Sequence, residues 1–422
     1  MGKINGYKGF DKELMCNTFQ YEIGKEYTQD GDIECCKNGF HFCENPFDVL
    51  RYYGPSNSRY CEVEGYGKTD RGNDNIAVSN IRIKKELDLT EFIKVCAKFT
   101  CDKVKCGKVL AENTCEHSIA RNSGYYSAAT NSGNYSVAEN TGHCSIARNS
   151  GEYSIAKNSG DYSVSMNTGH CSLASNSGDY SASINSGYRS FATNSGCSSA
   201  AINTGNCSVV LNSDNNSVAI NTGNYSIAEN SGDYSIASNS GNGSTAINKG
   251  HSSVATNSGE HSTATNSGHY STATNCGEYS VAINSGYSSI ASNSGNYSTA
   301  TNSGKCSSAS NCGYRSTATN SGDFSSATNN GYCSVATSNG KYSAAMSSGF
   351  RSVAKATGKD SIAIVTGNDC KAAGALGCWI VLTERDNLSH ILDVKSFKVD
   401  GEAIKPNTYY MLKNGKIVEA ED

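Results

Sequence analysis

Between Asn113 and Ile364, apolar and polar positions recur with a period of nine residues. The consensus is Asn-Ser-Gly-x-Tyr-Ser-x-Ala-x, and 28 units follow one another without a gap. Position 6 is Ser in all 28 units, position 3 is Gly in 26, and position 8 is Ala in 25. A fixed short period is typical of stacked units that cannot bury a face individually. The segment therefore predicts a solenoid.

The pattern within one unit predicts one short strand and one turn. Alternation along Tyr-Ser-x-Ala-x favours a strand of about five residues. Asn-Ser-Gly favours a turn of about four, in which Gly takes a positive φ. Two units then form a coil of about 18 residues, which predicts an all-β solenoid of the parallel β-roll type. A coil of three units remains an alternative, because Asn140–Ser145 recurs as Asn167–Ser172, three units later.

The charged positions indicate which side of the strand faces outward. Positions 6 and 8 share one side of the strand, and positions 5, 7 and 9 share the other. Position 9 carries Arg121, Glu139 and Lys157, and unpaired charges are rarely buried. We therefore expect Ser and Ala to line a thin interior. Position 7 is Ala, Val, Ile, Leu or Phe in 21 of 28 units, so this phase exposes two apolar rows. The opposite phase, with position 7 inside, stays open.

The flanking segments have ordinary composition and predict separate domains. Residues 1–112 predict a small α+β head, residues 113–364 the solenoid, and residues 365–422 a short β cap. Asn45 and Pro46 predict the start of one helix, and Thr90 the start of a second through about Lys103. The predicted strands of the head are Tyr21–Tyr27, Tyr60–Tyr66 and Ile76–Leu87. Asn414-Gly415 predicts a hairpin in the cap. Open solenoid ends expose strand edges, so both segments are expected to cap them.

Composition and charge exclude several classes of protein. The 422 residues carry a net charge of −4, with 18% charged and 37% hydrophobic residues. This near-neutral balance argues against phosphate-driven nucleic-acid binding, and residues 113–364 hold 12 acidic and 11 basic residues, too balanced for a DNA mimic. No apolar run reaches the length of a membrane span. The first residues, MGKINGYKGF, lack an apolar leader, so we expect a cytoplasmic protein. The 19 cysteines form no Cys-x-x-Cys pair and are expected as free thiols in a reducing compartment.

Two clusters have residue types that carry out chemistry in other proteins. Cys35, Cys36, His41 and Cys43 offer zinc ligands, but their spacing is poor and favours core packing. His143-Cys144, and likewise His170-Cys171, offer a base beside a nucleophile, but both pairs fall in repeat turns. We therefore expect no metal, no cofactor and no catalytic residue.

The outward positions supply the candidate binding surface. The tyrosines at position 5 are expected to form an aromatic ladder that stabilises the stack. Apolar rows at position 7 predict self-association into a homo-oligomer, because large exposed apolar patches need covering. The sequence therefore predicts a non-enzymatic structural or binding protein, a rigid rod that presents repeated surface rows. Four Thr-Ala-Thr segments favour ice or adhesin-like surface binding as the alternative, through Thr263, Thr265, Thr272, Thr274, Thr299, Thr301, Thr317 and Thr319.

The repeat resembles two known patterns. Repeats-in-toxin β-rolls also use nonapeptides at two per coil, but they place Asp where Ser stands here, so we expect no calcium sites. Asn216-Ser-Val-Ala-Ile220 is similar to the head repeats of trimeric autotransporter adhesins.

The head resembles an uncharacterised family of bacterial and phage proteins. Gly6-Tyr-Lys-Gly-Phe10 and Gly39-Phe-His-Phe-Cys-Glu-Asn-Pro46 carry the resemblance, which implies a similar head, small-residue nonapeptide repeats and a β tail. The same motifs, with Cys61-Glu-Val-Glu64, are also similar to the strand order of ADP-ribosyltransferases. That likeness places Lys8 and His41 at the first two catalytic positions and implies a degenerate transferase, because no fitting catalytic Glu follows.

Overall fold

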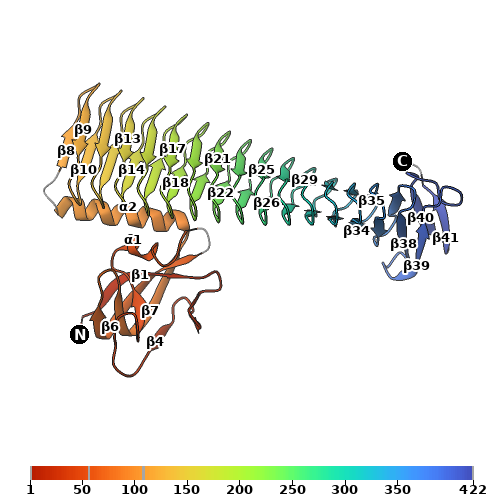
Figure 1. Cartoon of the computed structure of the whole chain (residues 1–422), viewed down its shortest axis with the longest axis horizontal. Coiled ribbons are helices and arrows are strands. Elements are labelled where there is room, and N and C mark those ends of the chain that lie inside the picture. The colour runs from red at the N-terminus through yellow and green to blue at the C-terminus, as the bar shows by residue number, and fades with distance from the viewer. Residues whose placement is uncertain (1, 56–57, 107–109, 421–422) are drawn as a thin grey trace. The chain divides into compact units, whose positions relative to one another are not determined.

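The computed structural model describes residues 2–55, 58–106 and 110–420. It divides into two compact units, residues 1–220 and residues 221–422. The first unit holds the head and the solenoid strands β8 to β20, and the second holds β21 to β41 (Figure 1). Among the described residues, neither helix has the length and apolar composition needed to cross a membrane.

The head is an antiparallel sheet with two helices. Its strand order is β1-β6-β7-β4, and β5 also pairs with β7. Asn45 caps the first helix, since its Oδ1 accepts a hydrogen bond from the Phe47 amide at 3.1 Å. The elements of the head are β1 (Ile4–Phe10), β2 (Met15–Cys16), β3 (Phe19–Gln20), β4 (Glu26–Thr28), β5 (Phe40–Phe42), α1 (Pro46–Val49), β6 (Arg59–Arg71), β7 (Ile76–Leu87) and α2 (Leu89–Cys106).

Most predicted elements of the head are confirmed. Strands cover Tyr60–Tyr66 and Ile76–Leu87, and helices begin close to Pro46 and Thr90. The strand predicted over Tyr21–Tyr27 is wrong before Glu26, because the chain turns there. Gly24 has a φ of +85°, and the Lys25 amide donates to the Glu22 carbonyl at 3.3 Å.

The solenoid part of each unit is built from parallel strands of four residues, which are shorter than predicted. In the first unit these are β8 (Leu110–Asn113), β9 (Ile119–Asn122), β10 (Ala128–Asn131), β11 (Val137–Asn140), β12 (Ile146–Asn149), β13 (Ile155–Asn158), β14 (Val164–Asn167), β15 (Leu173–Asn176), β16 (Ala182–Asn185), β17 (Phe191–Asn194), β18 (Ala200–Asn203), β19 (Val209–Asn212) and β20 (Val218–Asn221).

The second unit continues the same pattern. Its strands are β21 (Ile227–Asn230), β22 (Ile236–Asn239), β23 (Thr245–Asn248), β24 (Val254–Asn257), β25 (Thr263–Asn266), β26 (Thr272–Asn275), β27 (Val281–Asn284), β28 (Ile290–Asn293), β29 (Thr299–Asn302), β30 (Ser308–Asn311), β31 (Thr317–Asn320), β32 (Ser326–Asn329), β33 (Val335–Ser338), β34 (Ala344–Ser347), β35 (Val353–Ala356), β36 (Ile362–Val365) and β37 (Lys371–Gly374).

Each coil contains two repeat units. Every strand pairs with the strand after next, as when Ala237 of β22 lies beside Ala255 of β24. Even-numbered strands from β8 to β38 form one sheet, and odd-numbered strands from β9 to β37 form the other. The fold is therefore a parallel β-solenoid of about 15 turns. The alternative of three units per coil is wrong.

The predicted phase is confirmed. Ala237, Ala246 and Ala255 of three successive units are fully buried and pack together, and nearly all serines at position 6 are buried with them. Side chains at positions 7 and 9 point away from this interior. The strand, however, spans positions 7, 8, 9 and the following Asn rather than positions 5 to 9. The Asn side chain consequently points inward. The predicted strand ended before this Asn, so its inward direction was not expected.

The turn differs from the predicted one. The positive φ falls at position 5, as at Tyr279 (52°) and Tyr297 (52°), and not at the glycine of position 3. Gly is needed at position 3 because successive coils approach closely. A Cβ built on Gly259 would lie 2.0 Å from the carbonyl oxygen of Gly241, the equivalent residue of the preceding coil.

The inward asparagines join the two sheets. Asn257 of β24 donates from Nδ2 to the carbonyls of Ser244 (2.9 Å) and Thr263 (3.2 Å), which lie on the opposite side of the coil. Its Oδ1 accepts the Gly259 amide at 3.0 Å. The Asn257 side chain therefore supplies the partner of the Gly259 amide and adds a hydrogen bond to the Ser244 carbonyl, which also accepts the Thr263 backbone amide at 2.9 Å.

The serines form a second column of hydrogen bonds. Ser262 Oγ accepts from the Ser244 amide at 3.0 Å and donates to the Gly241 carbonyl at 3.2 Å. The interior hydroxyls therefore bind the backbone of the neighbouring coil. Where Ser replaces the inward Asn, the shorter side chain does not reach the carbonyls that Asn binds. Among the described residues, the buried Ser338 and Ser347 hydroxyls have no partner.

The C-terminal segment ends each sheet with an antiparallel hairpin. In the even-numbered sheet, β38 (Trp379–Arg385) pairs in parallel with β36 and antiparallel with β39 (Ile391–Lys398). In the odd-numbered sheet, β37 meets β40 (Tyr410–Lys413), which pairs with β41 (Lys416–Glu419). The hairpin predicted at Asn414-Gly415 is confirmed, with a positive φ at both residues. Ile380, Leu382 and Leu412 extend the alanine core into the cap.

The asparagine column predicts a large cost for one deletion. Asn257→Ala removes three buried hydrogen bonds and leaves the Gly259 amide without its partner, and should lower the free energy of unfolding by roughly 2–4 kcal/mol. The measurements are urea denaturation of the full chain and hydrogen exchange at the Gly259 amide, which should become faster. The neighbouring Thr256→Ala, on the outward face, should change stability by less than about 0.5 kcal/mol. Equal effects of the two substitutions would contradict the assigned role.

Candidate functional site

The head contains a cavity of about 550 Å³ beside β1 and β5. The cavity opens between the strands and the segment that follows α1. Its wall is formed by Tyr7, Lys8, Gly9, Cys16, Asn17, Cys36, Lys37, Gly39, His41, Phe42, Cys43, Val49, Tyr52, Tyr53 and Asn75. Lys8 and His41, the two residues named in the transferase likeness, therefore line the same cavity.

Lys8 is the most deeply placed polar group of this cavity. Its side chain is only 5% exposed, and Nζ donates to the His41 carbonyl at 2.7 Å. Nζ also lies 3.4 Å from Cys16 Sγ, which the Tyr53 hydroxyl contacts at 3.0 Å. Burial lowers the pKa of Lys8, and the nearby Cys16 opposes this shift. Cys16 and Tyr53 carry no signal in the sequence, because only the fold brings them to β1.

The ring of His41 is neutral in this geometry. Its Nε2 accepts a hydrogen bond from the Cys36 amide at 2.8 Å, which requires an unprotonated nitrogen. Burial, followed by the charge of Lys8, lowers the pKa of His41.

The four residues considered as zinc ligands have different contacts and do not converge on one site. Cys35 Sγ contacts Asn75 Oδ1 at 2.7 Å, and the backbone of Cys36 binds the His41 ring. Cys43 is buried, and burial raises the pKa of its thiol to about 12. In the part of the chain that the structure describes, no three His, Cys, Asp or Glu residues are grouped to hold a metal ion.

Glu62 and Glu64, the acidic residues of the transferase likeness, lie away from the cavity wall. Glu64 pairs with Lys3 at 2.8 Å, and Glu62 borders a different depression beside Asn5 and Lys84. No Asp or Glu stands among the described residues that line the cavity.

The head covers one apolar row of the first unit. This covered row is the set of side chains at position 7 in the even-numbered sheet, and each is at most 3% exposed. Phe92, Ile93 and Cys96 of α2 pack in the same cluster as Ile146 and Val164, and α2 runs alongside β10, β14 and β18 (Figure 1). The covered row consists of Ala128, Ile146, Val164, Ala182, Ala200 and Val218.

The expectation of two exposed apolar rows is therefore wrong for the first unit. The corresponding row of the odd-numbered sheet, here called the open row, stays accessible: Ile119 is 51% exposed and Phe191 is 46% exposed. It consists of Ile119, Val137, Ile155, Leu173, Phe191 and Val209.

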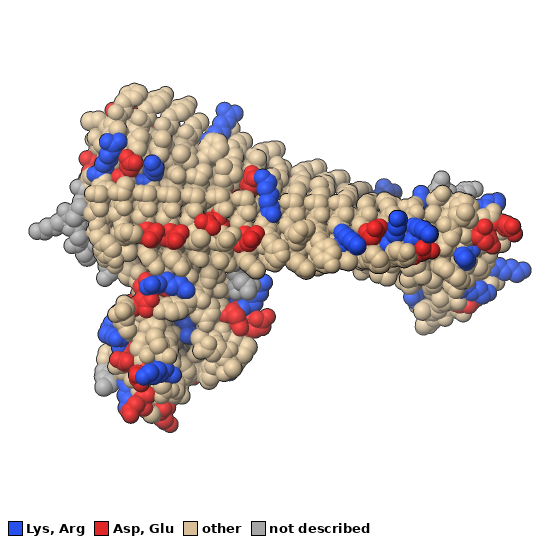
Figure 2. All heavy atoms as spheres, in the orientation of Figure 1, with Lys and Arg blue, Asp and Glu red and all other residues tan. Residues whose placement is uncertain are grey.

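Ordered side chains flank the open row on both sides. At position 9, Glu139 accepts from Arg121 at 2.9 Å and lies 3.5 Å from Lys157. At position 5, the rings of Tyr135 and Tyr153 stack with centroids 5.1 Å apart, as expected for an aromatic ladder. Charged side chains are sparse on the visible solenoid surface and gather on the head and near the C-terminus (Figure 2).

The eight candidate threonines are half-buried in the second unit. Three pairs lie in the odd-numbered sheet, on β25, β29 and β31, and the fourth lies on β26 in the other sheet. Thr299 is adjacent to Thr317, and Thr301 to Thr319. Val281 and Ile283 separate the pair on β25 from the other two.

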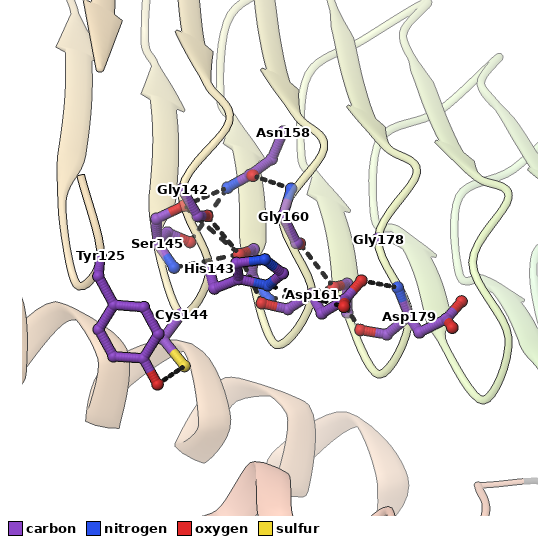
Figure 3. A network of polar contacts seen from close by, with 12 residues as sticks. Tyr125, Gly142, His143, Cys144, Ser145, Asn158, Gly160, Asp161, Gly178 and Asp179 are labelled. Carbon is purple, nitrogen blue, oxygen red and sulfur yellow. Dashed lines mark hydrogen bonds and ion pairs between the residues drawn. The ribbon is translucent and has the colours of Figure 1, made fainter. Parts of the chain in front are cut away.

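The His143-Cys144 pair does not form a nucleophile and its base. His143 Nδ1 lies 3.6 Å from Asp161 Oδ2, whereas Cys144 Sγ contacts the Tyr125 hydroxyl at 3.7 Å (Figure 3). Asp161 also accepts the Asp179 amide at 2.9 Å. Asp161 lies one full coil beyond His143, at the same repeat position, so proximity along the sequence gives no sign of this contact.

Asp48 of α1 predicts a pH dependence of stability. Burial, and then the charge of Asp74, raise its pKa from 3.8 to about 6. The folded state therefore binds a proton that the unfolded state releases, and this contribution to stability is lost as pH rises from about 4 to 6. Asp48→Asn should raise Tm relative to the unmodified chain at pH 7 and match it near pH 4. Thermal unfolding across this range is the measurement, with the exposed Asp32→Asn as control. A difference independent of pH would contradict the assignment.

Comparison with known proteins finds a family match for the head. Residues 4–95 match the model of a family described as a domain of unknown function (DUF7666). This fits the expected uncharacterised family with an N-terminal head. No curated protein and no solved structure matches the chain.

Proposed function

We propose that the chain is a non-enzymatic binding protein whose solenoid sheets present ordered rows of side chains, and that the open row mediates self-association. The observation that carries this proposal is the contrast between the two rows at position 7 of the first unit. The covered row is buried by α2, whereas Ile119, Ile155 and Phe191 of the open row are 36% to 51% exposed.

The covered row supports the proposal because it is an apolar row at position 7 that another element, α2, packs against. Its small and branched side chains stand at one residue per coil, and residues of α2 pack with them in one apolar cluster. The open row has the same spacing and larger side chains, with Leu173 and Phe191 among them. An exposed apolar strip of this kind is typical of a protein interface, and a second copy supplies an identical strip for a symmetric contact.

The head pocket supports binding rather than group transfer. Lys8 and His41 line it, but no described acidic residue does. A transferase of the kind that the sequence resembles has a catalytic Glu in its active site. The lining of the head pocket therefore favours a degenerate transferase fold over an active enzyme.

The self-association proposal is tested by charge insertion. Ile155→Lys together with Phe191→Lys should weaken association at least tenfold, because two ammonium groups would be desolvated in the interface. Sedimentation velocity over a concentration series is the measurement. Ser292→Lys with Ser310→Lys adds the same charge at outward sites of position 9 in the second unit and should leave association unchanged. A monomeric unmodified chain at every concentration would refute the proposal.

Ice binding is a second candidate, favoured by the three threonine pairs that share one sheet. The hydroxyl and methyl groups of these pairs repeat at the strand spacing of a parallel sheet and can order water at that spacing. Thr301→Tyr should then reduce thermal hysteresis, whereas Thr274→Tyr on the other sheet should not. Ice crystals that grow unshaped in the presence of the unmodified chain would eliminate this candidate.

A further inference from the structure

The ammonium group of Lys8 has no carboxylate partner among the described residues. Its two hydrogen-bond partners are the His41 carbonyl and Cys16 Sγ, and the rings of Phe10 and Tyr21 lie 5.5 Å from Nζ. Carbonyl and ring faces solvate a cation without neutralising it. A buried charge that lacks an opposite charge destabilises the fold, and replacing it with an apolar side chain is often favourable. The lysine therefore serves some purpose other than stability.

The described wall of the cavity leaves this charge uncompensated. Lys37, the other lysine of the wall, pairs with Glu34 at 2.5 Å, outside the cavity. His41 is neutral, as its hydrogen bond from Cys36 requires. Lys8 is consequently the positive group that an incoming molecule would meet at the base of the cavity.

The rest of the wall is aromatic and polar without charge. Tyr7, Phe42, Tyr52 and Tyr53 contribute rings, and Asn75 contributes an amide. A volume of about 550 Å³ is in the range of small-molecule sites, which combine apolar walls with a few oriented polar groups.

We propose that this head pocket binds a small organic anion that carries a planar ring, with its negative group on the Lys8 ammonium and its ring between the tyrosines. The anion supplies the counter-charge that the protein omits. Carboxylates and phosphates share this chemistry, and the probes below distinguish them. The site lies entirely within the head and is independent of the solenoid rows.

The first test uses the unmodified full chain with three probes of similar size. Benzoate carries a carboxylate, phenyl phosphate carries a phosphate, and benzamide is the neutral counterpart of benzoate. Isothermal titration calorimetry at low ionic strength should show that at least one anion binds at least tenfold more tightly than benzamide. The tighter anion identifies the class of negative group. Equal affinities for the anions and benzamide, or no binding of either anion, would overturn the proposal.

The second test assigns the charge to Lys8. Lys8→Met removes the charge and shortens the unbranched side chain by only one heavy atom, so anion affinity should fall at least tenfold while benzamide affinity changes little. Lys12→Met removes an exposed charge near the same strand and should leave anion affinity unchanged. Circular dichroism of the Lys8→Met variant checks its fold, and the comparison of probes on the unmodified chain stands if that variant is unfolded. Unchanged anion affinity in a folded Lys8→Met variant would overturn the proposal.

The third test separates an external anion from an internal one. Cys16 is the group nearest to Nζ that can itself become negative. Cys16→Ser should leave anion affinity within about threefold if the counter-charge comes from the ligand. Binding that is absent from the unmodified chain and present only in Cys16→Ser would show that the thiolate fills this role, and would overturn the proposal.

Discussion

The solenoid depends on satisfying polar groups inside a very thin interior. Two sheets lined by Ala and Ser bury little apolar area per residue, so unpaired backbone groups between the strands would outweigh the gain from burial. The inward Asn removes this difficulty. Asn257, for example, binds two carbonyls from the opposite side of the coil and one amide from its own turn. Each coil is thereby joined to its neighbours by hydrogen bonds as much as by packing.

This constraint explains which positions vary. Positions 1, 3, 6 and 8 are occupied by Asn, Gly, Ser and Ala because each faces another coil at close range. The Gly259 Cα lies so close to the Gly241 carbonyl that no side chain fits. Side chains at positions 5, 7 and 9 lie outside this interior and include the tyrosines, branched residues and charges. Variation outside a constant interior is what a repeated binding surface requires.

The head contributes two features that the repeats lack, a buried lysine and a helix that covers an apolar row. The solenoid surface visible in Figure 2 has few charges, and several charges of the solenoid are paired along the stack, as in Arg121, Glu139 and Lys157. The head, by contrast, keeps Lys8 buried without a carboxylate among the described residues and packs α2 on one apolar row. The same small domain therefore has two roles in the first unit: it covers a sheet, and it encloses a pocket.

The sequence by itself determined the repeat, the coil of two units as the favoured choice, the inward Ser and Ala, and most elements of the head. These follow from periodicity and from the avoidance of buried charge, which are local properties. Only the tertiary structure decided that Asn joins the interior, because its side chain binds carbonyls of the preceding and following strands, which belong to the opposite sheet. It also decided which row at position 7 is covered, and that Lys8, Cys16 and Tyr53 meet. The contacts of Lys8, Cys16 and Tyr53 join segments of the head whose spacing in sequence has no period, so no pattern along the chain could reveal them.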